Sequence, residues 1–218
     1  MREYRVIRRP KRQIVDDFHK LYYLLEPQTW GNTKWFGTDT LKCPFDLWTY
    51  QEILHEVQPD LIVETGTWGG GSALFLASMF DLMNRGSVVT IDIEEKPGRP
   101  QHQRITYMLG SSTAPEIVQR VRSMIGADDR VLVILDSDHS KDHVLRELEI
   151  YSDLVTPGSY VIVEDSNVNG HPVSPSFGPG PMEALREFLG RDQRFEIDRT
   201  REKFMLTFNP SGYLRRTG

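Results

Sequence analysis

Residues 61–72 read LIVETGTWGGGS, a short apolar run that leads into a glycine-rich segment. The run LIV predicts a buried strand, and the glycines predict a tight turn in which the backbone can approach a ligand closely. The following residues, Ser72–Asn84, have the apolar spacing of a helix. A strand, a glycine turn and a helix in this order are typical of an α/β sheet that binds a ligand.

Short apolar runs and helical patterns alternate through the rest of the chain. The runs are continuously apolar and β-branched, which is typical of strands that are buried on both faces. The alternation predicts an α/β fold: a doubly wound, mostly parallel seven-stranded sheet with helices on both faces. The expected strands are Leu61–Val63, Val88–Ile93, Ile105–Leu109, Val131–Leu135, Tyr160–Val163, Phe195–Ile197 and Phe204–Phe208, and the expected helices are Ser72–Asn84, Ala114–Ile125, Lys141–Leu154 and Pro181–Leu189.

A helical section precedes this sheet. Apolar residues have helical spacing in residues 14–22 and again in residues 47–54, with a loop that carries aromatic residues between them. These aromatic residues are expected to pack against the body of the protein rather than to bind a ligand. We therefore expect residues 1–58 to form an N-terminal arm and helical extension, and residues 59–218 to form the catalytic domain.

Composition excludes several classes of protein. The 218 residues, 39% hydrophobic and 26% charged, suit one large domain with a sizeable core. The single cysteine, Cys43, excludes an internal disulfide framework and a Cys-rich zinc site. The longest uncharged stretch, Thr65–Phe80, has 16 residues, whereas a membrane span needs ~20 apolar residues.

Charge is uneven along the chain. The first 12 residues hold six Arg or Lys and one Glu, so with a net charge of −5 the remaining chain carries −10. Such an acidic body is a poor surface for nucleic acid. A secretory signal has an apolar segment after its basic start, and this chain has none there. We expect a solvated basic tail, a small-molecule substrate and a cytoplasmic location. A docking arm that supports a homo-oligomer is the alternative.

The glycine turn predicts a nucleoside site without phosphate. Trp68 stands where a dinucleotide fingerprint needs its second glycine, and no Gly-Lys-Ser/Thr follows as in a phosphate-binding loop. The motif is instead an acid, Glu64, followed by Gly66 and Gly70, and an acid here suits an ammonium or sulfonium group. Asp92, 26 residues after Gly66, can accept hydrogen bonds from ribose hydroxyls. Together these features predict S-adenosylmethionine (SAM) as the ligand.

Three further acids predict a metal site. Asp136 follows one expected strand, and Glu164 and Asp165 follow the next. If the two strands are parallel neighbours, these carboxylates meet at one edge of the sheet. Oxygen ligands without cysteine suit Mg²⁺ or another hard divalent cation.

A histidine is the expected general base. His139 lies three residues after Asp136, and its titration range suits proton transfer near neutral pH. His143, one turn further on, is expected on the helix surface. Residues 166–181 form a loop rich in Pro, Gly and Ser that is expected to cover the metal. His171 in this loop is the other candidate for the base.

These motifs resemble two groups of enzymes. Asp136 with the Glu164–Asp165 pair resembles the metal triad of class I, catechol-type O-methyltransferases, although Glu-Asp replaces Asp-Asn and His139 replaces a lysine. Residues 48–191 look closer still to the family named after cephalosporin hydroxylase, which includes bacterial rhamnosyl and natural-product O-methyltransferases. The matching segments are ETGTWGGGS (64–72), LDSDH (135–139), VED (163–165) and GPGPMEA (178–184).

The resemblance implies a Rossmann-like methyltransferase fold and methyl transfer from SAM to a hydroxyl group. The acceptor it implies is a deoxysugar on a natural product or glycolipid. It also implies that Asp136, Glu164 and Asp165 bind Mg²⁺ and that His139 is the catalytic base. The residues expected to bind SAM are Glu64, Gly66, Thr67, Gly70, Ser72, Asp92, Ser112 and Asp136.

The family name itself suggests an oxygenase, but none of the six histidines lies in the His-x-Asp/Glu pattern of non-haem iron sites. Three other functions stay open. A Mg²⁺-dependent hydrolase leaves the glycine turn and Asp92 unexplained, and a nicotinamide oxidoreductase is disfavoured by Trp68. A non-catalytic SAM-binding module is disfavoured by the intact set of acids and His139.

Overall fold

The computed structural model describes residues 10–218. Residues 1–9, which carry most of the predicted basic tail, lie outside the described residues. A seven-stranded sheet forms the centre of the molecule, and a two-stranded sheet lies in the N-terminal section. The strands of the large sheet are β3 Leu61–Thr65, β4 Ser87–Asp92, β5 Ile105–Leu109, β6 Val131–Leu135, β7 Tyr160–Val163, β8 Phe195–Ile197 and β9 Tyr213–Arg216.

The strand order confirms the predicted sheet. From one edge to the other the order is β5-β4-β3-β6-β7-β9-β8. The first five of these strands pair in parallel, and β9 lies antiparallel between β7 and β8. The order reverses at β3 and β6, and a crevice for a ligand opens at the carboxyl ends of strands at such a reversal.

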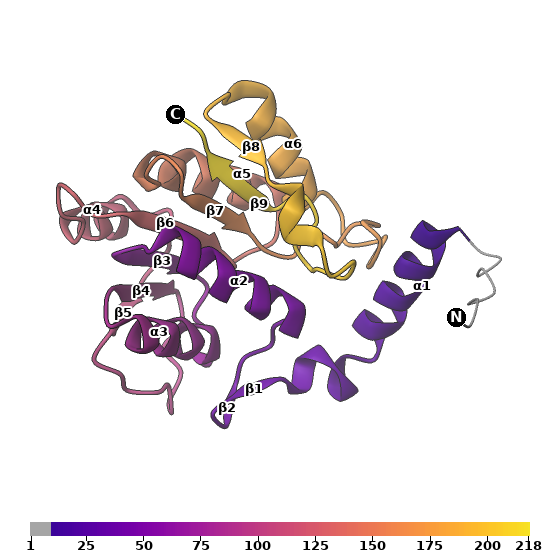
Figure 1. The fold of residues 1–218 in the computed structure, drawn as a ribbon, viewed down its shortest axis with the longest axis horizontal. Helices are drawn as coiled ribbons and strands as arrows, with labels where there is room; N and C mark the ends of the chain where they lie inside the picture. Colours follow the sequence, from indigo (N-terminus) through magenta and orange to yellow (C-terminus); the bar gives the residue numbers. More distant parts are fainter. Residues whose placement is uncertain (1–9) are drawn as a thin grey trace, which may run out of the picture.

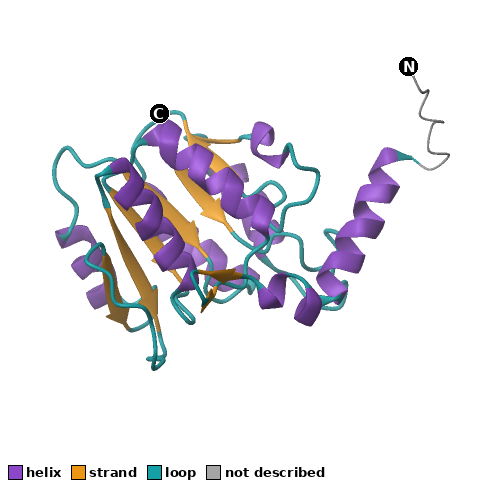
Figure 2. Ribbon diagram, turned by 60° about the horizontal axis from the view of Figure 1, so that its bottom comes forward, coloured by secondary structure: helices purple, strands orange, loops and turns teal. Residues whose placement is uncertain are grey.

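Helices cover both faces of the sheet (Figures 1 and 2). On one face, Phe75, Leu76 and Phe80 of α3 (Gly71–Met83) pack with α2 (Pro44–Val57) against Ile62 and neighbouring strand residues. On the other face, three helices bury residues such as Val121, Leu148 and Leu185 against the sheet. The two layers confirm the predicted doubly wound fold. These helices are α2 Pro44–Val57, α3 Gly71–Met83, α4 Pro115–Ser123, α5 Lys141–Tyr151 and α6 Pro181–Arg191, and the short 3-10 helices are η1 Glu26–Gln28, η2 Trp30–Asn32, η3 Ser152–Leu154 and η4 Arg199–Glu202.

One predicted strand is wrong. Phe204–Phe208 is not part of the sheet, and the last strand is β9 instead. The apolar side chains of Leu206 and Phe208 are buried in a loop, where they pack against Cys43 and N-terminal aromatics. The backbone N–H of Phe208 donates to the Asp46 carboxylate (2.8 Å), so a side chain replaces the strand partner that the pattern suggested.

The N-terminal section contains the helix α1, Lys11–Leu24, which projects from the side of the molecule (Figure 1). A short hairpin of β1, Lys34–Trp35, and β2, Thr38–Asp39, lies in the predicted loop. Trp30 packs with Tyr23 of α1 against Phe208. The division of the chain at residue 58 stays a prediction.

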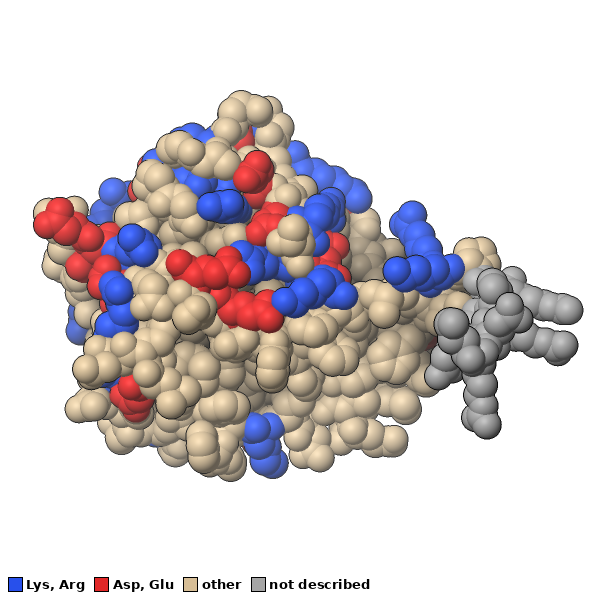
Figure 3. Space-filling view, viewed as in Figure 1, with Lys and Arg blue, Asp and Glu red and all other residues tan. Residues whose placement is uncertain are grey.

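Acidic and basic side chains are intermingled on the face in Figure 3. Two ion pairs join α2 to the segment after β8, one between Arg201 and Glu56 and one between Lys203 and Glu52. Among the helices within residues 10–218, none combines the length and the apolar character that crossing a membrane requires.

Candidate active site

A cavity of about 510 Å³ lies at the carboxyl ends of β3, β4, β5 and β6. Four residues of the predicted SAM set line it: Gly66, Asp92, Ser112 and Asp136. The cavity has the size of a small-molecule site and lies at the position where sheets of this topology bind ligands. Its other lining residues are Trp68, Ile91, Ile93, Glu94, Gly110, Ser111, Ser137, Asp138 and His143.

Gly66 is required where β3 meets β6. Its φ angle is +84°, and a Cβ atom built on it would lie 1.8 Å from the backbone oxygen of Asp136. No L side chain fits so close to a neighbouring backbone. The glycine therefore lets the turn after β3 lie directly beside Asp136, so that both line one cavity.

Asp92 holds the glycine turn in place. One carboxylate oxygen accepts the backbone N–H groups of Thr67 (3.1 Å) and Trp68 (2.8 Å), and Arg99 donates to the same oxygen (3.1 Å). The other oxygen accepts the N–H of Glu94 (3.0 Å). The carboxylate is thus oriented and neutralised by its own chain at the wall of the cavity.

The remaining members of the predicted SAM set lie in the turn or directly beneath it. Glu64 is fully buried, and Thr90 donates to its Oε2 atom (2.7 Å), while Thr67 shares a hydrogen bond with Thr90 (2.7 Å). Burial raises the pKa of Glu64. Its other oxygen, Oε1, has no hydrogen-bond partner among the described residues, which is costly for a buried acceptor. Gly70 and Ser72 lie at the start of α3.

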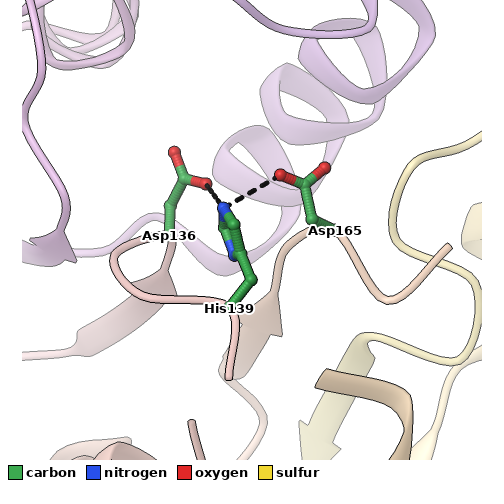
Figure 4. A group of neighbouring side chains, drawn as sticks. All are labelled: Asp136, His139 and Asp165. Atoms are coloured by element: carbon green, nitrogen blue, oxygen red, sulfur yellow. Dashed lines mark ion pairs between the residues drawn. The ribbon is translucent and has the colours of Figure 1, made fainter. Parts of the chain in front are cut away.

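Asp136, His139 and Asp165 converge at the neighbouring strand end (Figure 4). The Nε2 atom of His139 lies 3.1 Å from Asp165 Oδ2 and 4.0 Å from Asp136 Oδ1. One ligand atom of each residue lies within 4.8 Å of the others, so the group could hold a metal ion. Asp136 belongs both to this group and to the wall of the cavity.

Glu164, the third predicted metal ligand, lies behind this group and is 4% exposed. It pairs with Lys42, whose Nζ atom lies 2.5 Å from Glu164 Oε1 and also contacts Asp136. Burial opposes the charge on Lys42, but Asp136 and Glu164 outweigh it and raise the pKa of the lysine. Burial and the charge of Asp136 raise the pKa of Glu164 to about 7. Burial likewise raises the pKa of Asp136.

Sequence reasoning did not identify Lys42. The residue lies ahead of the first large-sheet strand, in the predicted loop before α2, and no pattern in the chain marks it. Lysine side chains are rarely buried, so its residue type gives no reason to place it in a site. Only the fold reveals that this side chain reaches strand ends that lie about 90 and 120 residues away in the sequence.

The expectation for His143 is wrong, because the side chain lines the cavity instead of the helix surface. Its Nε2 atom lies 3.1 Å from Ser137 Oγ, 3.3 Å from Ser112 Oγ and 3.3 Å from Glu147 Oε1. Glu147 is fully buried, and its hydrogen bond raises the pKa of His143. The sequence signal was the i, i+4 spacing of His143 and Glu147 on one helix face.

His171 lies apart from the acidic group. Its Nε2 atom is 2.8 Å from Glu183 Oε1 at the start of α6. It lines a second cavity, of about 840 Å³, that α1, α6 and residues 199–211 also border. Of the two candidate bases, only His139 belongs to the group formed with Asp136 and Asp165.

Comparisons with known proteins agree with this architecture. Residues 27–217 match the model of a family described as Rhamnosyl O-methyltransferase/CmcI. The Rhamnosyl O-methyltransferase of Mycobacterium leprae (strain TN) is 42% identical over 220 residues, which cover 97% of this chain and 94% of that protein. The Rhamnosyl O-methyltransferase of Mycobacterium tuberculosis (strain ATCC 25618 / H37Rv) is 38% identical over 216 residues, which cover 95% and 87%.

A solved structure of CmcI, described as its D160 form with Mg and SAM, has the same fold. The TM-score is 0.63 at 21% sequence identity, and the match covers 85% of this chain and 77% of that one. The predicted family is confirmed by the family match over most of the chain and by both relatives. The chain belongs to the Rhamnosyl O-methyltransferase/CmcI family.

Proposed function

We propose that the protein transfers a methyl group from SAM to a sugar hydroxyl, with Mg²⁺ bound beside the donor. The observation that carries the proposal is the double position of Asp136, which lines the cavity and also belongs to the group with His139 and Asp165. A donor in the cavity and an acceptor at that group would thus lie against one carboxylate.

Residues of the cavity wall, together with the buried Glu64 beneath the glycine turn, fit the three parts of SAM. The orphaned Glu64 Oε1 and the close backbone at Gly66 suit the methionine ammonium and the sulfonium. Asp92 is fixed at the wall and suits the ribose, and Ser112 with His143 suits the adenine. The CmcI structure contains Mg and SAM, which supports the assignment of both groups to this fold.

Asp136, Glu164 and Asp165 are the residues that would hold Mg²⁺, since hard cations prefer carboxylate oxygens. When bound, the ion supplies a Lewis acid that lowers the pKa of the acceptor hydroxyl. His139 takes the proton of that hydroxyl, and the Asp165 carboxylate, 3.1 Å from its Nε2 atom, stabilises the imidazolium that forms. The acceptor oxygen forms its bond to the methyl carbon as the carbon–sulfur bond breaks, and S-adenosylhomocysteine leaves.

A deoxysugar hydroxyl on a natural product or glycolipid is the acceptor we favour. Two relatives that cover nearly the whole chain are named for methylation of a rhamnosyl group. We further propose a cytoplasmic location.

A methylation assay tests the proposal. Purified protein with SAM, Mg²⁺ and a panel of rhamnosyl glycosides should add one methyl to a glycoside, as read by mass spectrometry. EDTA should abolish the product and excess Mg²⁺ should restore it, while Asp136→Asn should remain inactive under both conditions. Wild-type turnover that is unaffected by EDTA would contradict the metal scheme, and hydrolysis of a glycoside without SAM would favour the hydrolase alternative.

A further inference from the structure

We propose that Lys42 is a permanent positive charge at the metal centre. Its ammonium group holds the carboxylates of Glu164 and Asp136 and lowers the affinity of the centre for a divalent ion. The inference rests on the proposed function, because that function places a divalent ion at these acids. The observation on which it stands is the position of the Lys42 ammonium between Glu164 and Asp136, where its side chain is 5% exposed.

The backbone around Lys42 is held from two sides. The hydroxyl of Thr33 accepts the backbone N–H of Lys42 (3.2 Å) and donates to the backbone oxygen of Trp30 (2.8 Å). A Cβ atom on Gly71 would lie 2.2 Å from the backbone oxygen of Asp39, so the segment before Lys42 packs tightly on the start of α3. The lysine therefore reaches the acids from a rigid position rather than from a mobile loop.

Lys42 contacts two of the three predicted metal ligands, Asp136 and Glu164, and does so in different ways. Glu164 is bound to the ammonium, whereas the ligand atoms that lie within reach of one ion belong to Asp136, His139 and Asp165. Asp136 contacts Lys42 and is also a member of that group. A divalent ion held by Asp136 and Asp165 would share Asp136 with the ammonium, and two cations on one carboxylate repel each other.

Lys42 is a positioning residue and not an alternative base. Its nearly buried ammonium contacts the carboxylates of Asp136 and Glu164 and is not part of the wall of the 510 Å³ cavity. Its positive charge allows the acids to lie together before a metal ion binds. Without this charge, the carboxylates of Asp136 and Glu164 lack a positive partner, and a divalent ion can take its place.

Direct measurement of Mn²⁺ binding tests the inference, with metal-free protein and no SAM or acceptor present. In calorimetry, Lys42→Met should bind Mn²⁺ about tenfold or more tightly than the wild type, because one repelling charge is absent. Lys42→Arg keeps the charge and should stay within about threefold of the wild type. Lys34→Met removes an exposed lysine that pairs with Asp39 and is the matched control, with no change expected.

Equal or weaker Mn²⁺ binding by Lys42→Met would overturn the inference. If Lys42→Met does not fold without metal, refolding with and without Mn²⁺ decides the matter through circular dichroism. Recovery of the fold in Mn²⁺ supports a site in which the ion replaces the ammonium, and failure in both conditions overturns it. Normal Mn²⁺ binding and methylation by the wild type, with no effect of Lys42→Met, would refute this inference while the proposed function stands.

Discussion

At the scale of single residues, Gly66 sets the approach of β3 to β6. The contact between a Cβ atom on this residue and the backbone of Asp136 cannot be relieved by a side-chain rotation, because a Cβ position is fixed by its own backbone and the Asp136 atoms are main chain. We expect Gly66→Ala to lower the free energy of unfolding by about 3 kcal/mol or more, as backbone strain and overpacking add together.

Gly69→Ala is the matched control in the same turn. A Cβ atom there would lie 3.8 Å from Asp39, an ordinary contact, and we expect a change of about 1 kcal/mol or less. Urea denaturation of both variants gives the comparison. Equal losses of stability would show that the strands can separate at Gly66 without cost.

His139 gives a second residue-scale prediction. His139→Ala should lower kcat by about 10²–10⁴, since a positioned base is lost. SAM affinity should stay unchanged, because His139 is not part of the cavity wall. His171→Ala, whose imidazole pairs with Glu183, should keep kcat within a few-fold. Steady-state kinetics with calorimetry of SAM binding measures both quantities, and the opposite pattern would assign the base to His171.

At the scale of elements, α1 is attached to the body through few side chains. His19 on its inner side stacks on Phe208 and lies 3.0 Å from the Asn167 side-chain nitrogen. Burial lowers the pKa of His19 to about 4, although Asp16 opposes the shift. The folded protein thus prefers the neutral imidazole, and this helix contact depends on pH.

Acidification should therefore weaken the packing of α1 on the body and lower the free energy of unfolding. The unfolded chain binds a proton on His19 near pH 6.5, whereas the folded chain does so near pH 4. The contribution of His19 to the free energy of unfolding is therefore complete above pH 6.5 and decreases as the pH falls from 6.5 to 4. The loss amounts to about 3 kcal/mol at most, with no further loss below pH 4. Urea unfolding from pH 7.5 to 4 measures it, and His19→Gln should show a correspondingly smaller decrease. Parallel curves for the two proteins would refute this role of His19.

At the scale of the whole molecule, the cavity lies between strand ends that belong to one sheet. A ligand that binds there holds the ends of β3 to β6 together and stabilises the folded state by mass action. SAM at 100 times its Kd should raise the Tm by about 5 to 10 °C, which corresponds to about 2.7 kcal/mol in a chain of this size.

A thermal-shift assay with SAM, NAD⁺ and Mg²⁺, added singly and in pairs, checks this expectation. NAD⁺ should have no effect, because Trp68 lies on the cavity wall where a pyrophosphate needs bare backbone. A shift with NAD⁺ alone would favour the oxidoreductase alternative. A protein that responds to neither SAM nor Mg²⁺ would contradict the proposed function.

The order of elements was predictable from local patterns. The expected strands Ile105–Leu109, Val131–Leu135 and Tyr160–Val163 have the bounds of β5, β6 and β7, and the expected start of α6 at Pro181 is also confirmed. Strands buried on both faces need continuous apolar runs, so burial leaves a direct trace in the sequence. The strand β9 was not predicted, because only two apolar residues precede its two arginines. Its pairing with β7 and β8 orders it in the folded protein.

The sequence by itself determined which residue types follow each strand, and with them the acidic edge of the sheet. Only the tertiary structure decided that Lys42 lies between Asp136 and Glu164, that Asp92 holds the glycine turn, and that His143 lines the cavity. The physical reason is that side-chain alternation and helical spacing are local properties, whereas charge pairing depends on distance in space. Lys42 and Glu164 are about 120 residues apart in the sequence, so no periodic pattern in the chain indicates that they pair.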